Sequence, residues 1–149
     1  MQESSARNYI AMEFPNRPEN VGVARIAVAA LAAQLDFTLE EVDEIKVATS
    51  EAVSNAILHG YRGRTGVVKV RAEVDAERLE VVVQDEGQGI ADVELARQPS
   101  YSTDPERMGL GFVFMESFMD ELEIDSAPGR GTRIRMVKVP QRKKKAAEA

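Results

Sequence analysis

The chain of 149 residues contains no cysteine. Disulfide bonds, thiolate metal sites and cysteine nucleophiles are therefore excluded, although this absence only weakly favours a reducing compartment. The sequence also lacks any run of about eighteen apolar residues, and its first residues do not form the apolar core of a signal peptide. It predicts neither a membrane span nor a secretory leader, and we expect a cytoplasmic protein.

Several other signatures are missing. There is no Gly-x-x-x-x-Gly-Lys-Ser/Thr phosphate loop, and the expected elements do not alternate as βαβ units, which disfavours a doubly wound dinucleotide fold. No internal repeat or interdomain linker is evident, and the length suits a single domain. We expect one domain over residues 1–140 and a basic, disordered tail over 141–149.

Acidic side chains outnumber basic ones in the body of the chain. The net charge is −6, but the last nine residues carry four positive charges and one negative charge, which leaves −9 on the first 140 residues. An acidic body repels nucleic-acid phosphate. The sequence therefore argues against direct nucleic-acid binding.

Periodic patterns predict both helices and strands. Alternation at 10–14 predicts a strand, and a capping box formed by Thr38 and Glu41 marks the start of a long helix. The predicted helices cover 19–35, 38–60 and 112–119, and the other predicted strands cover 67–74, 79–83, 122–125 and 132–139. Residues 91–108 show no periodicity and lie between two glycine motifs, which suggests a functional lid. The fold class is α+β: a two-layer sandwich with a mixed, mostly antiparallel sheet of about five strands and helices on one face.

Glu51 and Asn55 lie four positions apart on the long helix and project from nearly the same face. An asparagine carbonyl is a hard oxygen ligand suited to Mg²⁺, and a nearby glutamate can accept a proton from an attacking hydroxyl group. For an isolated pair, a polar helix face in contact with solvent is the commoner explanation.

Two glycine clusters follow the long helix in the sequence. Asp85 ends an apolar strand and precedes Gly87 and Gly89, so that a carboxylate able to accept from the amino group of adenine stands where backbone can approach a ligand closely. Gly109 and Gly111 precede a predicted helix, whose free N–H groups favour phosphate. Taken alone, the first cluster is also a good turn sequence.

Two further residues accompany these clusters. His59 is the only histidine, and at a helix end it is more often a hydrogen-bonding or capping group than a phosphoacceptor. Arg107 precedes the second glycine cluster and would place a cation near a terminal phosphate, although a surface arginine is the commoner case.

Together and in this order, four segments resemble the motifs of the GHKL superfamily of ATP-binding domains. The segment 50–61 resembles its N box, 85–90 its first glycine box, 107–112 its second glycine box, and Gly131-Thr132 its closing motif. Over nearly its full length the chain is similar to the anti-sigma factor serine kinases, most of all to those of the sporulation (anti-sigma-F) type. The segments 24–30, 94–99 and 114–121 carry this closer similarity.

The resemblance implies a role for each matching residue. Glu51 would be the catalytic base, Asn55 the Mg²⁺ ligand and Asp85 the adenine contact. Arg25 matches an arginine used for partner binding, with a plain surface arginine as the alternative. Further nucleotide contacts would be Gly87, Gly89, Gly109, Gly111 and Thr132. The lid is about two residues shorter than the family form. This difference affects which roles the resemblance can assign to Ser102, Thr103 and Arg107.

The resemblance further implies a homodimeric enzyme that uses ATP or ADP with Mg²⁺, inhibits a sporulation sigma factor, and phosphorylates a serine of an anti-anti-sigma protein. The alternatives are an anti-sigma kinase of the general-stress (sigma-B) type and a non-catalytic binding module gated by ATP or ADP. A histidine kinase is disfavoured because no phosphoacceptor helix is present, and a gyrase-like or MutL-like ATPase needs a further transducer domain.

Overall fold

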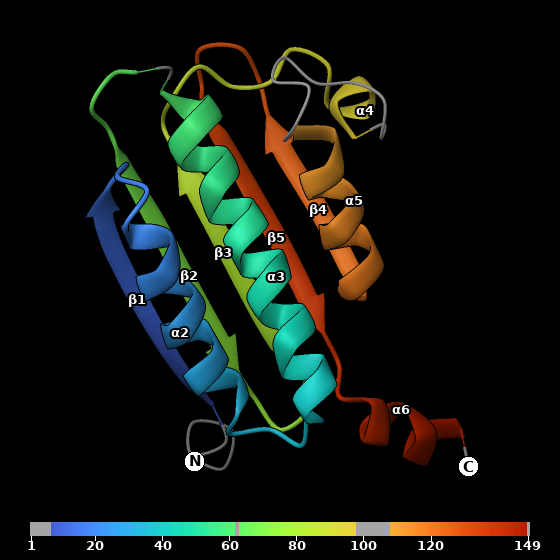
Figure 1. The fold of residues 1–149 in the computed structure, drawn as a ribbon. Helices are drawn as coiled ribbons and strands as arrows, with labels where there is room; N and C mark the ends of the chain where they lie inside the picture. The colour runs from blue at the N-terminus through green and yellow to red at the C-terminus, as the bar shows by residue number, and fades with distance from the viewer. Residues whose placement is uncertain (1–6, 62, 98–107, 149) are drawn as a thin grey trace.

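A computed structural model describes residues 7–61, 63–97 and 108–148 of the chain. Its five described strands form one sheet in the order β1-β2-β3-β5-β4 (Figure 1). The strands are β1 (Asn8–Pro15), β2 (Val67–Val74), β3 (Leu79–Asp85), β4 (Glu121–Ser126) and β5 (Thr132–Lys138). The predicted α+β sandwich is confirmed, and all four pairings between these strands are antiparallel, so the described sheet is not mixed.

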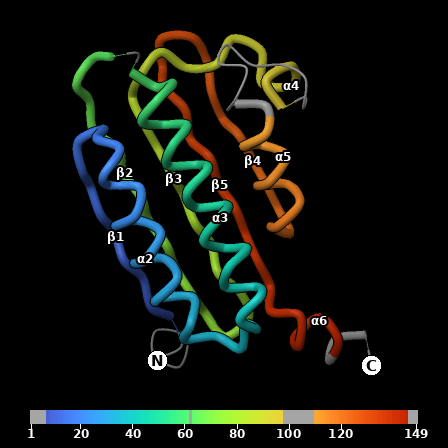
Figure 2. The backbone as a smooth tube through the Cα atoms, viewed as in Figure 1, coloured from blue at the N-terminus to red at the C-terminus, as the bar shows by residue number. Residues whose placement is uncertain are grey.

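The helices cover one face of this sheet (Figure 2). Helix α2 lies over β1 and β2, helix α3 packs on β3, and helix α5 packs on α3 and β4. Their bounds are α2 (Asn20–Ala32), α3 (Leu39–Asn55) and α5 (Met108–Phe118). The region 91–108, predicted to be irregular, contains the short helix α4 (Val93–Ala96) and the first residue of α5, while 98–107 lie outside the described residues.

Alternation along the strands separates the two faces of the sheet. In β2, Val68 and Val70 are fully or almost fully buried, whereas the alternating residues Lys69 and Arg71 are exposed, as the sequence predicts. In β3 the buried positions recur every second residue from Leu79 and end at Asp85. The carboxylate therefore occupies a position on the core face, beneath the helical layer.

The predicted capping box is present at the start of α3. The hydroxyl of Thr38 accepts a hydrogen bond from the backbone N–H of Glu41 at 3.1 Å, and the backbone N–H of Thr38 donates to Oε1 of Glu41 at 2.9 Å. These bonds satisfy two donors that would otherwise lack partners at this helix end. The sequence thus fixes where α3 begins.

The C-terminal segment differs from the expected disordered tail, because Gln141–Glu148 form helix α6. The backbone N–H of Gln141 donates to Oε2 of Glu41 at 2.9 Å, and Arg142 pairs with Asp36 at 3.3 Å. Arginine, lysine, alanine and glutamate are good helix formers. Glu41 accepts from the start of α6 as well as from Thr38, so one carboxylate caps two helices.

Glu41→Ala is expected to lower the free energy of unfolding by about 2 kcal/mol, since it removes acceptors at two helix starts. Glu40→Ala is the matched control, because Glu40 is exposed in the same helical turn. Urea denaturation of both variants measures the difference. Equal losses of stability in the two variants would contradict the double cap.

Candidate active site

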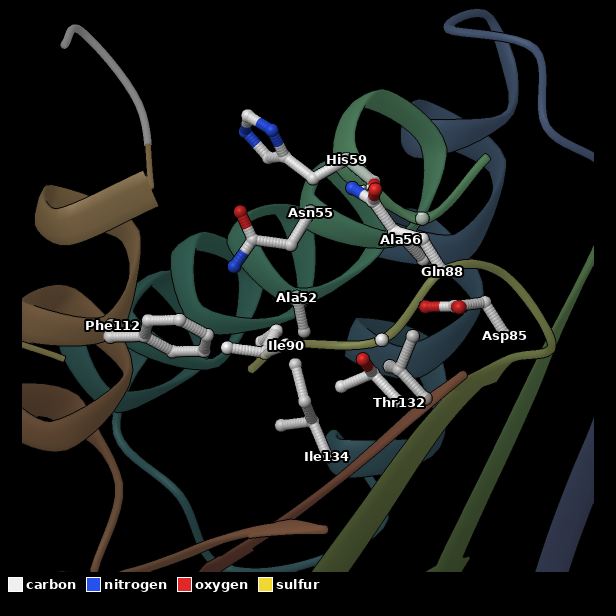
Figure 3. A pocket seen from close by; sticks show the side chains of 13 residues that line it. Ala52, Asn55, Ala56, His59, Asp85, Gln88, Ile90, Phe112, Thr132 and Ile134 are labelled. Atoms are coloured by element: carbon white, nitrogen blue, oxygen red, sulfur yellow. Dashed lines mark hydrogen bonds between the residues drawn. The ribbon is translucent and has the colours of Figure 1, made fainter. Parts of the chain in front are cut away.

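A pocket lies between the helical layer and the sheet, close to the ends of α3 and β3 (Figure 3). Its empty volume is about 400 Å³, part of which is open to solvent. Its lining comes from four segments far apart in the sequence. The lining includes Ala52, Asn55, His59, Gly60, Asp85, Gln88, Gly89, Phe112 and Thr132.

Asp85 and Thr132 form the polar floor of the pocket. They are direct partners on the neighbouring antiparallel strands β3 and β5, and both side chains face the pocket. Opposed residues of an antiparallel pair bring their side chains close together. The register thus places a carboxylate beside a hydroxyl group, so the predicted adenine contact and one of the predicted further nucleotide contacts lie together.

The Asp85 side chain is only 5% exposed. Burial raises the pKa of its carboxyl group, and hydrogen bonds from the backbone N–H groups of Gly87 and Thr132 partly oppose that rise. The bond from Gly87 to Oδ1 measures 2.9 Å. The carboxylate is therefore held in place by backbone donors, at the cost of desolvation.

Glycine is required where the backbone packs around Asp85. A Cβ atom on Gly60 would lie 3.0 Å from Cγ and Oδ1 of Asp85, and one on Gly87 would overlap the carbonyl group of Gly60. Gly89 and Gly131 have φ angles of 76° and 79°, a region that residues with side chains rarely adopt. The first glycine box thus permits close packing of the loop after β3 against the end of the long helix.

Gly87→Ala is expected to lower the free energy of unfolding by about 2 kcal/mol or more, because the added methyl group displaces the Gly60 carbonyl group. Gly22→Ala is the control: its Cβ would meet only the Arg25 guanidinium, at 3.4 Å, and alanine favours a helix. Urea denaturation compares the two. A Gly87→Ala protein as stable as the Gly22→Ala protein would show that the loop does not pack this closely.

The long helix does not continue in α form to Gly60 as predicted. Its last turn is a π-helix, η1 (Ala56–Gly60). The carbonyl groups at its end accept from Gln88: the backbone N–H donates to Gly60 at 2.7 Å, and the side-chain Nε2 donates to the carbonyl of His59 at 2.6 Å. No local sequence pattern marks Gln88 for this role, because its partners lie 28 and 29 positions earlier in the chain.

The buried His59 side chain also lines the pocket. Its backbone carbonyl accepts the hydrogen bond from Gln88 at the end of η1. π-Helical turns are frequent at functional sites, because the wider turn changes where the side chains point. Here the turn brings His59 to the same pocket as Asn55, as Figure 3 shows.

Glu51 and Asn55 meet the first turn of α5. A Cβ atom on Gly111 would lie 3.0 Å from Oε1 of Glu51 and 3.6 Å from Nδ2 of Asn55, so the backbone of the second glycine box lies directly against both side chains. Asn55 lines the pocket, and its buried Nδ2 has no hydrogen-bond partner within the described part of the chain. Because amide oxygen and nitrogen are interchangeable by rotation, this end of the side chain can present either atom to a ligand.

Arg25 lies on the outer surface of the helical layer. It donates to the hydroxyl of Ser50 at 3.5 Å, and it lines a surface hollow together with Lys46, Val47 and Glu51. The predicted partner-binding arginine and the predicted base therefore border the same hollow. Any protein docked on Arg25 would lie next to Glu51.

The remaining predicted site residues lie at the start of α5 or outside the described part of the chain. Gly109 lies in the first turn of α5. Ser102, Thr103 and Arg107 lie outside the described residues. Within the described ranges, no group of three or more histidine, cysteine, aspartate or glutamate side chains is arranged to hold a metal ion. No helix of those ranges is long and apolar enough to cross a membrane.

Comparison with known proteins settles the family. Residues 14–138 match the model of the histidine kinase-like ATPase domain. The anti-sigma F factor of Thermoanaerobacter sp. (strain X514) is 47% identical over 133 residues, which cover 88% of this chain and 93% of that protein. The chain belongs to the anti-sigma F factor family. A further member, from Halalkalibacterium halodurans, is 49% identical over 131 residues, covering 86% of this chain and 90% of its own.

Solved structures show the same fold at much lower identity. The structure of the RsbU and RsbW domains of a Mycobacterium tuberculosis protein has a TM-score of 0.60 at 19% identity, covering 89% of this chain and 32% of the other. The histidine kinase domain of a blue-light activated kinase from Erythrobacter litoralis has a TM-score of 0.59 at 22% identity, covering 89% and 64%. The similarity to the GHKL superfamily is thus confirmed by both sequence and fold.

Proposed function

We propose that this protein is an anti-sigma factor with protein serine kinase activity: it binds and inhibits a sporulation sigma factor of the sigma-F type and transfers phosphate from ATP to a serine of an anti-anti-sigma protein. The observation that carries the proposal is the position of Glu51 and Asn55 against Gly111, at one side of the pocket that Asp85 and Thr132 floor. Family membership supports it, since the relatives are anti-sigma F factors.

Residues at two sides of the pocket suit the two ends of a nucleotide. Asp85 and Thr132 offer oxygen atoms to a base in a site that the apolar side chains of Phe112 and Ala52 help to enclose. Gly109 and Gly111 provide the N-terminal turn of α5, where free backbone N–H groups attract phosphate. Arg107, immediately before that helix, adds a cation for the terminal phosphate in this proposal.

A magnesium site fits the residues present. Mg²⁺ is usually held by one or two protein oxygens together with phosphate oxygens and water, and Asn55 offers one amide beside the first turn of α5. When bound, the ion neutralises charge that develops on the phosphate groups. Asn55 would hold it, which also explains why an otherwise buried amide lacks a protein partner among the described residues.

Glu51 would accept the proton of the attacking serine hydroxyl. It lies one helical turn from Asn55 and borders both the first turn of α5 and the hollow that contains Arg25. A serine presented by a protein docked on that hollow reaches Glu51 without entering the base pocket. This arrangement favours a protein as the phosphate acceptor, because the catalytic base Glu51 lies where the nucleotide site meets an outer surface.

The test is to incubate purified protein with radiolabelled Mg-ATP and candidate anti-anti-sigma proteins, and then to map the labelled residue. Phosphoserine on an antagonist is the expected result. Tight ATP binding without label on any candidate would instead support a non-catalytic module gated by ATP or ADP. Label on an antagonist of the general-stress sigma-B system alone would assign the protein to that type. Sedimentation of the same sample tests the proposed homodimer.

Arg25→Ala is expected to weaken sigma-factor binding at least about tenfold, as loss of an arginine that anchors an interface does. ATP affinity should not change, since Arg25 does not line the base pocket. Arg64→Ala, at an exposed arginine of another surface hollow, is the matched control. Titration of labelled sigma factor measures both. Equal binding by the two variants would assign Arg25 to the plain surface.

A further inference from the structure

Ser126 lies at the end of β4, beside Thr132 but outside the lining of the base pocket. Its hydroxyl oxygen is within hydrogen-bond distance of three groups: the backbone N–H of Ile90 at 2.7 Å, the carbonyl oxygen of Gly131 at 3.0 Å, and Oγ1 of Thr132 at 2.8 Å. No motif of the sequence includes this serine. Its partners are the last residue of the first glycine box, the residue just before β5 and the first residue of β5.

Only one arrangement of the hydroxyl hydrogens makes all three contacts hydrogen bonds. The N–H of Ile90 can only donate, and the carbonyl of Gly131 can only accept, so the single hydroxyl hydrogen of Ser126 points to Gly131. In this arrangement the remaining contact, which either hydroxyl could donate, is donated by Thr132. With its hydrogen committed to Ser126, Oγ1 of Thr132 has only lone pairs left for the pocket.

The neighbouring Asp85 carboxylate is also an acceptor when it is ionised. The floor of the pocket therefore presents two acceptors side by side and no hydroxyl donor. A base carrying an amino group at this edge can donate to both oxygens, whereas the carbonyl oxygen of a 6-oxopurine meets lone pairs and only its N1–H remains to donate. Selectivity between the two arises because a mismatched pair leaves buried polar groups without partners.

We propose that Ser126 is a specificity-determining positioning residue: by holding the hydroxyl hydrogen of Thr132, it makes the pocket select a 6-aminopurine over a 6-oxopurine nucleotide. This inference rests on the proposed nucleotide site and goes beyond it, because Ser126 acts through Thr132 and does not itself line the pocket. Removing Ser126 frees the Thr132 hydroxyl to turn and donate to a 6-oxo group.

The experiment compares the dissociation constants of ATP and inosine triphosphate, which differ at the 6-position of the purine. The unaltered protein should prefer ATP, and in Ser126→Ala this preference should fall about fivefold, the effect of one hydrogen bond. Ser126→Thr, which keeps a hydroxyl group, should retain the preference. An unchanged ratio in Ser126→Ala would overturn the inference.

A second background separates this role from a merely structural one. In Thr132→Val there is no hydroxyl to direct, so adding Ser126→Ala should leave the ratio as it is in the single Thr132→Val variant. If Ser126→Ala lowers the ratio equally in both backgrounds, Ser126 does not act through Thr132 and the inference is wrong.

Thr132→Val by itself gives a test that does not require Ser126→Ala to fold. It should weaken ATP and leave inosine triphosphate unchanged, because Thr132 offers the 6-oxo group no donor. A greater loss of inosine triphosphate than of ATP would contradict the inference. Failure of the unaltered protein to bind either nucleotide would contradict the proposed function itself, which keeps the two failures distinguishable.

Discussion

Glu51→Gln is expected to lower the rate of phosphoryl transfer to the antagonist at least about a thousandfold, within the range for loss of a general base. Glutamine keeps the size of the side chain and its position against Gly111, but it cannot take the serine proton. ATP affinity should stay within about threefold of the unaltered protein, because Glu51 does not line the base pocket and the contacts there are unchanged. Single-turnover transfer of radiolabel, together with equilibrium ATP titration, measures both quantities.

Glu40→Gln is the control for this variant, since Glu40 is an exposed glutamate of the same helix. It should transfer phosphate at the rate of the unaltered protein. Phosphorylation that persists in Glu51→Gln at a similar rate would show that Glu51 is not the base. Loss of ATP binding together with transfer would show instead that Glu51 contributes to holding the nucleotide.

Asp85→Asn is expected to weaken ATP binding at least about a hundredfold, since it replaces a charged acceptor at a buried site by an amide that can turn its own donor toward the base. Asp125→Asn is the control, because Asp125 is exposed on β4 and does not line the base pocket. Equilibrium titration with ATP measures the change. An ATP affinity similar to that of the control would exclude Asp85 as the base contact.

The same substitution should have the opposite effect on stability without nucleotide. Burial raises the pKa of the Asp85 carboxyl group above its ordinary value of 3.8, so the folded protein holds this proton at a pH at which the unfolded chain has lost it. The favourable contribution is therefore complete below the unfolded pKa and is lost as pH rises through the folded pKa. At neutral pH the buried charge costs stability.

Apo Asp85→Asn should therefore have a higher free energy of unfolding than the unaltered protein at neutral pH, and the difference should shrink as the pH is lowered toward the ordinary pKa of aspartate. Urea denaturation over a pH series measures it. A difference that grows toward acid pH would mean that the charged form is favoured in the folded state. The expected result identifies Asp85 as a residue that costs stability and serves binding.

Local patterns in the sequence carried much of this description. The capping box of Thr38 and Glu41 involves residues three positions apart, and the alternation of β2 depends only on the pleat of a strand, so both could be predicted without the fold. The same holds for Glu51 and Asn55, whose shared helix face follows from their spacing. These features depend on neighbours in the chain, and helix and strand geometry is the same wherever the element lies.

Contacts between distant segments could not be predicted in this way. The C-terminal residues were expected to be disordered because they are strongly charged. The contact that holds them comes from Glu41, one hundred positions earlier, whose carboxylate accepts a hydrogen bond from Gln141. The π-helical turn of η1 likewise has no pattern of its own, and its carbonyl groups are satisfied by Gln88 after the next two strands. Each depends on which surfaces pack together.

The sequence by itself determined the family, the α+β class, the position of the long helix and the residue types available for ATP chemistry. Each of these follows from local spacing and from the order of the motifs. Only the tertiary structure decided that Gly111 lies against Glu51 and that the hydroxyl groups of Ser126 and Thr132 are in contact. Those contacts join separate elements, and they exist only because the apolar faces of the helices and the sheet pack in one particular arrangement.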